Sequence, residues 1–173
     1  MEFSIEKKKN ENIHRYPSDD VRIAQRFAQH LKNELGDFLI ASVMFGSSVR
    51  RQATPESDID VLVISDDTNF QITNELIEGY RIIVENSILR ISSKLHVTSM
   101  TFTSFWEYAR AGDPVVVNIL RDGVALIDIG FFEPLQRLLK QGRIRPSEES
   151  VWRYYGRSPR TLLNSRWHVL QAT

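Results

Sequence analysis

The pattern of apolar and polar positions along the chain changes repeatedly between a period of two and a helical period. Apolar runs of strand length predict four strands, over residues 38–45, 58–64, 94–101 and 124–127. Apolar residues at helical spacing predict five helices, over residues 19–35, 73–91, 103–111, 114–121 and 132–141. Strands that alternate with helices in this way indicate an α/β architecture.

Two of these helices carry more detailed expectations. The first is expected to be capped by Ser18 and to stop at Gly36, with Asp19 and Asp20 at its positive end. The helix over residues 73–91 is expected to be amphipathic and to bury its apolar side chains. These are Leu76, Ile77, Ile83, Ile88 and Leu89.

Composition narrows the function classes. The chain has 173 residues and no cysteine, which excludes disulfide frameworks, thiolate metal sites and cysteine nucleophiles. Its 22 Lys and Arg residues balance 22 Asp and Glu residues, so the formal net charge is zero and does not favour nonspecific binding along nucleic acid. The first sixteen residues are polar and no apolar run reaches membrane-spanning length, so we expect no signal peptide, no membrane partner and a cytoplasmic location.

Charge is concentrated near the end of the chain. Residues 140–173 contain seven Lys and Arg residues against two Glu residues, a net charge of +5 that the other residues offset. This segment is either a solvated helix face or a surface for RNA or an acidic protein. We therefore divide the chain into three parts. They are a charged N-terminal arm (1–16), a central domain (17–141) and a basic linker with a helical extension (142–173).

The last part ends in a helical pattern with no closing Gly or Pro. It is either a complete terminal helix or the start of a further helical domain in a longer protein.

Two carboxylates stand out within the second predicted strand. Asp58 and Asp60 are two residues apart, so a strand would point both toward one face, while Ile59 and Val61 point to the other. Like charges side by side on a core strand repel each other, and a divalent cation removes that conflict. Because Mg²⁺ prefers one or two carboxylates together with phosphate oxygens, this spacing indicates a magnesium site.

A phosphate-binding element precedes these carboxylates. Gly46 and Ser47 follow the first apolar strand, at a predicted helix start. Glycine permits close approach of the backbone, and a helix N-terminus offers unpaired N–H groups to a phosphate. Ser47 adds a hydroxyl, and Arg50 would lie one turn later with a guanidinium able to reach a phosphate oxygen.

The stretch FGSSVRRQATPESDIDVLVI resembles the signature of the nucleotidyltransferase superfamily that includes DNA polymerase β, and most closely its minimal nucleotidyltransferase branch. The family motif is a hydrophobic residue, Gly-Ser, about ten residues, and then Asp-hydrophobic-Asp-hydrophobic. The matching positions are Phe45, Gly46, Ser47, Asp58, Ile59, Asp60 and Val61. The family's arginine falls on Arg50, whereas Arg51 stands where a glycine often follows. The resemblance covers roughly residues 20–140.

The resemblance implies a short mixed sheet flanked by helices, with a C-terminal helical extension. It also implies transfer of a nucleotidyl group from an NTP to a hydroxyl of a protein or RNA, with Mg²⁺ or alternatively Mn²⁺. Gly46, Ser47 and Arg50 would then bind the nucleotide, and Asp58 and Asp60 would be catalytic metal ligands.

The chain departs from the family pattern at one position. Family enzymes usually carry a third carboxylate on the next core strand, but residues 94–101 contain neither Asp nor Glu. His96 aligns with that position, and Thr98 is its neighbour on the same face. His96 can be a catalytic base, a metal ligand or a half-buried histidine without catalytic work. Glu85 on the preceding helix is a weaker substitute.

Two functions therefore remain open. The first is an active, metal-dependent nucleotidyltransferase. The second is a weak or inactive domain that binds a partner, because small members of this family often act as antitoxins of a helical HEPN toxin or are fused to one. A third interpretation assigns RNA binding to residues 140–173, through Arg153, Arg157 and Arg160.

Overall fold

The computed structural model describes residues 10–46, 57–152 and 155. The elements comprise the predicted strands and α-helices, in the predicted order with small shifts of their ends, and 3₁₀-helices that were not predicted. They are the 3₁₀-helix η1 (Glu11–Arg15), α1 (Ser18–Leu35), the 3₁₀-helix η2 (Gly36–Phe38), β1 (Leu39–Phe45), β2 (Ile59–Ser65), α2 (Asn74–Ile91), β3 (Leu95–Thr101), α3 (Phe102–Ala111), α4 (Pro114–Asp122), β4 (Val124–Asp128) and α5 (Phe132–Lys140).

The strands form one mixed sheet in the order β3-β2-β1-β4. β1 is antiparallel to both of its neighbours, β2 and β4, whereas β2 and β3 are parallel. A parallel pair needs a crossover connection, and α2 provides it. The two central strands are continuous apolar runs because helices cover both of their faces. The expected α/β fold with a short mixed sheet is confirmed.

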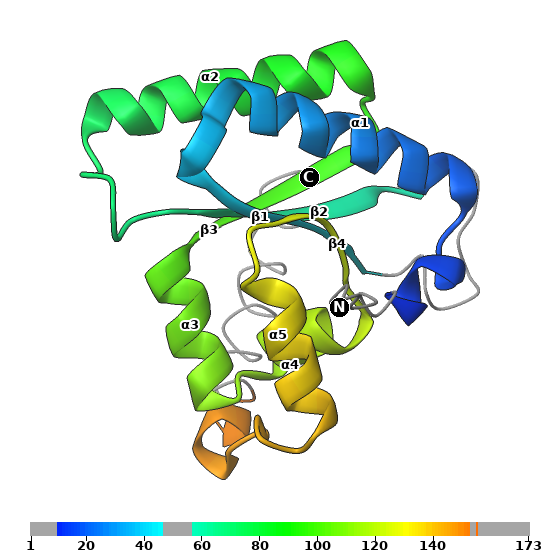
Figure 1. The fold of residues 1–173 in the computed structure, drawn as a ribbon, viewed down its shortest axis with the longest axis vertical. Helices are drawn as coiled ribbons and strands as arrows, with labels where there is room; N and C mark the ends of the chain where they lie inside the picture. Colours follow the sequence, from blue (N-terminus) through cyan, green and yellow to red (C-terminus); the bar gives the residue numbers. More distant parts are fainter. Residues whose placement is uncertain (1–9, 47–56, 153–154, 156–173) are drawn as a thin grey trace, which may run out of the picture.

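Helices pack on both faces of the sheet (Figure 1). α1 and α2 cover one face, where Phe27 and Leu31 meet Val61 and Val63 of β2. α3, α4 and α5 cover the other face, and the side chains there include Phe105, Leu120 and Phe132 packed with Leu62 and Ile64. Alternate residues of β2 therefore belong to different cores, as the two-residue period of a strand requires.

Two details of the predicted helices are wrong. Ser18 does not cap α1, because Pro17 holds the N-cap position and Ser18 is already the first helical residue. The Ile77 and Leu89 side chains of α2 were expected to be buried, but they are 51% and 83% exposed. Gly36 ends α1 as expected, with a φ of 55° that favours glycine.

The burial of α2 was predicted wrongly because only a narrow stripe of this helix packs against the rest of the protein. α2 buries a stripe that includes Val84 and Ser87, with Tyr80 and Ile88 partly buried beside it. The buried Ser87 hydroxyl donates to the Ile83 carbonyl at 2.6 Å, so the helix itself satisfies this polar group. Apolar residues outside this stripe face solvent.

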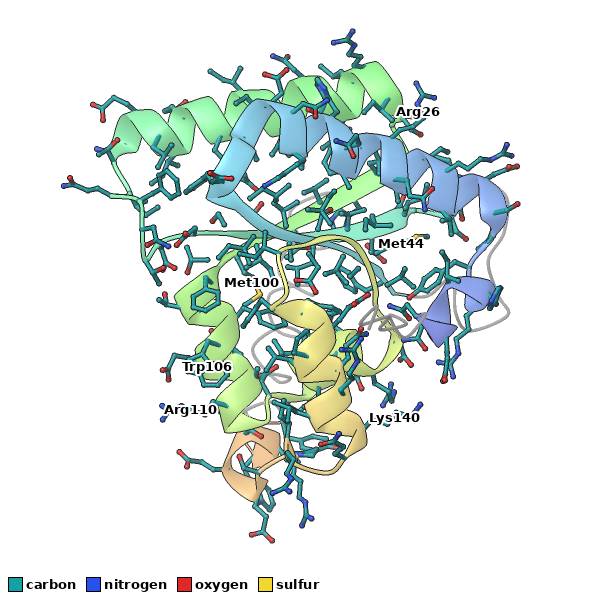
Figure 2. The ribbon with its side chains drawn as sticks, viewed as in Figure 1. Arg26, Met44, Met100, Trp106, Arg110 and Lys140 are labelled. Carbon is teal, nitrogen blue, oxygen red and sulfur yellow. The ribbon has the colours of Figure 1, made fainter. Side chains whose placement is uncertain are left out.

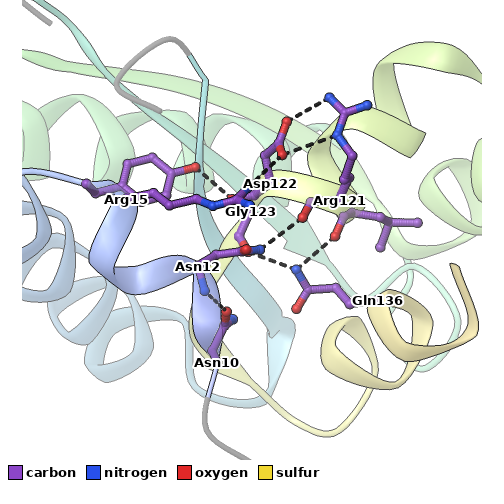
Figure 3. A network of polar contacts seen from close by, with 9 residues as sticks. Asn10, Asn12, Arg15, Arg121, Asp122, Gly123 and Gln136 are labelled. Atoms are coloured by element: carbon purple, nitrogen blue, oxygen red, sulfur yellow. Dashed lines mark hydrogen bonds and ion pairs between the residues drawn. The ribbon is translucent and has the colours of Figure 1, made fainter. Parts of the chain in front are cut away.

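The segment around η1 packs against the end of α4 (Figure 3). A helix leaves its last carbonyl groups without intrahelical donors. Asn12 Nδ2 donates to two carbonyl oxygens there, at 3.0 and 3.1 Å, and the Tyr16 hydroxyl donates to a third at 2.9 Å. These acceptors belong to Arg121, Gly123 and Asp122. Residues 10–16 of the expected N-terminal arm thus form part of the folded unit.

A further helix begins at residue 148, inside the segment expected to be a linker. Ser147 caps it, since the Ser150 amide donates to the Ser147 hydroxyl at 3.1 Å. Arg153, Arg157 and Arg160, the side chains expected to bind RNA, lie outside the described residues. The division into arm, domain and helical extension stays a prediction.

Candidate functional site

Three residues of the family motif and its surroundings lie in one row across the sheet, where β1 ends and β2 and β3 begin. Phe45 is opposite Asp60 on the antiparallel pair, and Asp60 is beside His96 on the parallel pair. Asp60 shares its face of β2 with Leu62 and Ile64, which pack toward α3, α4 and α5. The row therefore lies at one end of the sheet, on the face that these three helices cover.

Gly46 directly follows this row, and its lack of a side chain makes room for Asp60. Its φ of 102° is a conformation that side chains rarely adopt. A Cβ atom built there would lie 2.3 Å from Asp60 Oδ2, far inside van der Waals contact. Glycine is thus required here both by the backbone conformation and by the neighbouring carboxylate.

His96 and Asp60 form a pair across the two parallel strands. His96 Nδ1 lies 3.0 Å from Asp60 Oδ1. The His96 side chain is 68% exposed and that of Asp60 is 26% exposed, so the carboxylate is sheltered and the imidazole is accessible. This exposure contradicts the interpretation of His96 as a half-buried residue. Its ring nitrogen binds one oxygen of Asp60, while the other oxygen faces Gly46.

The other predicted site residues in the described part of the chain form no hydrogen bond or ion pair with Asp60 or His96. Asp58 precedes β2 and is exposed. The pairing with β3 starts beside it, since the Ile59 amide donates to the Lys94 carbonyl at 2.7 Å. Ser47 and Arg50 lie outside the described residues. Glu85, the weaker substitute for a third carboxylate, lies on α2 and pairs with Arg81 at 3.8 Å.

A divalent cation at this end of the sheet would need several oxygen ligands. Within residues 10–46 and 57–152, no three His, Asp or Glu side chains are grouped so that they could hold a metal ion. Two carboxylates are nevertheless sufficient for Mg²⁺ when phosphate oxygens complete its shell. Asp60 Oδ2 also sits in the space that the missing Gly46 side chain leaves. Asp58 and Asp60 are carboxylates, the type of oxygen ligand that a hard cation such as Mg²⁺ prefers.

Tyr16 is a neighbour of the site that sequence reasoning missed. Its side chain is buried, and its hydroxyl is bonded to the Asp122 carbonyl. Burial and then the negative charges of Asp122 and, more weakly, Asp60 raise the pKa of the Tyr16 hydroxyl far above its usual value, although Arg15 opposes them. Tyr16 is therefore held neutral close enough to sense the charge of Asp60. A single aromatic residue after a polar stretch gives no sequence signal for this position.

None of the helices in the described segments is both long enough and apolar enough to cross a bilayer. A cytoplasmic location stays a prediction from the sequence.

Comparison with known proteins places this geometry in context. A family model described as a nucleotidyltransferase domain matches residues 22–126, well over half of the chain. Among curated proteins, no sequence matches the chain.

Several solved structures are similar. One is a protein from Sulfolobus solfataricus assigned to the nucleotidyltransferases, with 14% identity, a TM-score of 0.45, and coverage of 72% of this chain and 94% of that one. A toxin–antitoxin complex with AMP-PNP has 13% identity, a TM-score of 0.42, and coverage of 83% and 98%. A mutant of the toxin–antitoxin pair MntA–HpeT has 12% identity, a TM-score of 0.40, and coverage of 81% and 94%.

Proposed function

Since the chain belongs to the nucleotidyltransferase domain family, we propose that it transfers a nucleotidyl group from an NTP to a hydroxyl of a protein or RNA acceptor. The observation that carries this proposal is the position of Asp60. Its carboxylate lies between Gly46 and His96 at the end of the sheet, in a strand whose other side chains are almost all buried. A partly sheltered carboxylate near the start of a core strand is better suited to bind a metal ion and its phosphate than to pack within the apolar core.

The nucleotide would enter over Gly46. The absent side chain of Gly46 leaves room for Asp60 Oδ2, so a cation carried by the phosphates would meet this carboxylate beside Gly46. In this proposal Ser47 donates its hydroxyl to the β- and γ-phosphates, and Arg50 donates its guanidinium to a phosphate oxygen. These two roles rest on the sequence motif alone.

Asp58 and Asp60 would hold Mg²⁺, or Mn²⁺ in its place. Bound there, the cation neutralises phosphate charge and lowers the pKa of a coordinated hydroxyl. Asp60 can supply Oδ2 to the cation while Oδ1 remains bonded to His96, because the two oxygens have different neighbours. Asp58 is exposed and can turn toward the same ligand.

His96 would act as the general base. An ionised carboxylate only accepts hydrogen bonds, so the bond to Asp60 places the proton of neutral His96 on Nδ1. Nε2 then carries the lone pair and takes the proton of the acceptor hydroxyl. The acceptor oxygen forms a bond to the α-phosphorus, the bond from that phosphorus to the β-phosphate oxygen breaks, and pyrophosphate leaves with the electron pair.

The second candidate function is a weak or inactive domain that works by binding, for example as an antitoxin of a HEPN-type helical protein. One observation favours it. β3 carries no carboxylate, and His96 occupies the position beside Asp60 where one would complete the metal shell. This candidate predicts partner binding without label transfer.

Two labelled nucleotides separate the candidates. The purified chain would be incubated with a fractionated cell extract and with ATP, GTP, CTP or UTP labelled at the α-phosphate, and in parallel at the γ-phosphate. We expect the α-label to enter a protein or RNA band and the γ-label to leave as pyrophosphate. Transfer of the γ-label would indicate a kinase instead, and absence of any transfer with Mg²⁺ or Mn²⁺ would favour the binding function.

A further inference from the structure

An open groove of about 360 Å³ lies between α1 and α2, on the opposite face of the sheet from Asp60 and His96. Four of its lining side chains come from one face of α1, and two come from the last turn of α2. They are Arg26, Gln29, His30, Asn33, Arg90 and Ile91. Figure 2 shows Arg26 in this helical layer, across the sheet from Trp106 and Arg110 on α3.

The cations of this groove have no anionic partner in the described part of the chain. Arg81 and Arg110, by comparison, are exposed arginines that do have acidic partners, since Arg81 contacts Glu78 and Arg110 contacts Glu107. Neither Arg26 nor Arg90 forms an ion pair with any described residue, and no carboxylate lines the groove. Two guanidinium groups and an imidazole are thus directed to one open, polar surface. A surface of this kind attracts anions.

The chemistry of the groove favours phosphates over carboxylates of a protein partner. Guanidinium groups bind phosphate oxygens with two parallel hydrogen bonds. Gln29 and Asn33 add neutral donors and acceptors, and the amide of Gln29 already bonds Asn33 at 3.1 Å. Ile91 is the one apolar side chain in the lining, whereas protein interfaces rely on an apolar core.

The shape of the groove favours a chain of phosphates over a single one. Arg26 and Asn33 are seven residues apart on α1, which separates them by roughly 10 Å along the helix. The groove is open, so a strand can pass through it. Arg90 is six residues before His96, so the chain between them spans at most roughly 20 Å. A strand in the groove is therefore within a few nucleotides of the candidate catalytic edge.

We propose that the groove lined by Arg26, His30 and Arg90 binds the phosphodiester backbone of single-stranded RNA. RNA would then be the acceptor class of the proposed transferase, and this part of the inference rests on the proposed function. Phosphate contacts position the strand, and the carboxamides of Gln29 and Asn33 contact its sugars or base edges. The binding itself requires neither NTP nor metal.

The test measures binding of a fluorescein-labelled oligouridine strand to the full chain by fluorescence anisotropy, in EDTA and without nucleotide, over a series of salt concentrations. The variant is Arg26→Gln/Arg90→Gln. The matched control is Arg81→Gln/Arg110→Gln, which removes the same charge from α2 and α3. Circular dichroism establishes that both variants are folded. We expect the groove variant to lose about 10-fold in affinity and the salt slope to fall by about 1.4.

Several results would overturn the proposal: unchanged affinity in the groove variant, an equal loss in the control, or equal competition by an oligoglutamate peptide, which would indicate an acidic protein ligand. Displacement of the strand by free ATP would also overturn it and would indicate a nucleotide site. A separate titration with NTP and Mg²⁺ distinguishes the two claims. RNA binding that fails while NTP binding persists overturns the groove alone, and the reverse overturns the transferase.

Discussion

Asp60 and His96 occupy paired positions on the two parallel strands of the sheet, with Nδ1 of the imidazole 3.0 Å from Oδ1 of the carboxylate. A third carboxylate at this position would add another anionic ligand to the metal shell, whereas His96 binds Oδ1 of Asp60 and Oδ2 lies against Gly46. In the proposed mechanism, this pair supplies a metal ligand and an oriented base from neighbouring strands.

Replacement of His96 tests its role as a base. We expect His96→Ala to slow nucleotidyl transfer by roughly 100-fold or more, the usual contribution of a general base, with NTP affinity changed little. Single-turnover transfer of the α-label and calorimetric NTP titration measure the two quantities separately. Since the side chain is mostly exposed, the melting temperature should stay close to that of the parent. An unchanged transfer rate would exclude His96 as the base.

A second prediction concerns the close approach of Gly46 to Asp60. Gly46→Ala would place a methyl group against Asp60 Oδ2 and force the carboxylate to move. We expect NTP·Mg²⁺ binding to be lost. We also expect the free energy of unfolding to fall by about 1–3 kcal/mol, because alanine is strained at a φ of 102°.

Gly130 provides the matched control. It has the same φ of 102°, but a Cβ atom there would meet no atom within 4 Å. Gly130→Ala should therefore show the conformational cost in a urea unfolding curve without the loss of nucleotide binding. If both variants bind NTP equally well, the close approach of Gly46 to Asp60 has no part in the site.

The sequence was sufficient for the order of the elements, because apolar runs and helical periods are local signals. It also directed attention to Asp60, since paired carboxylates in an apolar strand are unusual, and the role of Asp60 in the site stays a prediction. The contact stripe of α2 was not predictable, because Ile77 and Leu89 have the helical spacing of core residues. Nor was the position of Tyr16, which depends on a hydrogen bond to Asp122, 106 positions away.

Docking of the N-terminal segment makes a third prediction. Asn12→Ala removes two hydrogen bonds to the end of α4, and we expect the free energy of unfolding to fall by about 1–2 kcal/mol. Tyr16→Phe removes the buried bond to Asp122 and should cost about 1 kcal/mol. Urea unfolding measures both, with Glu107→Ala on α3 as an exposed control. Equal midpoints for all the proteins would contradict the docked arrangement.

Asp66 gives a pH dependence of stability. Burial disfavours its ionised form, but hydrogen bonds from Asn69 and Thr68 outweigh burial and hold the pKa at about 2, below the ordinary 3.8. A depressed carboxyl pKa stabilises the fold fully above pH 3.8, and that contribution is lost as the pH falls toward 2. Thermal unfolding across this range should show a smaller loss for Asp66→Asn than for the parent. The same slope in both proteins would contradict the assignment.

Calorimetric titration of the four NTPs tests the central claim most directly, because it requires no knowledge of the acceptor. The chain would be titrated with Mg²⁺, with Mn²⁺ and with EDTA, beside Asp58→Asn/Asp60→Asn. We predict that at least one NTP binds, that binding requires the divalent cation, and that the double variant abolishes it. Absence of binding by the parent chain at millimolar NTP, or binding that persists in the double variant, would contradict a nucleotide–metal site at this edge of the sheet.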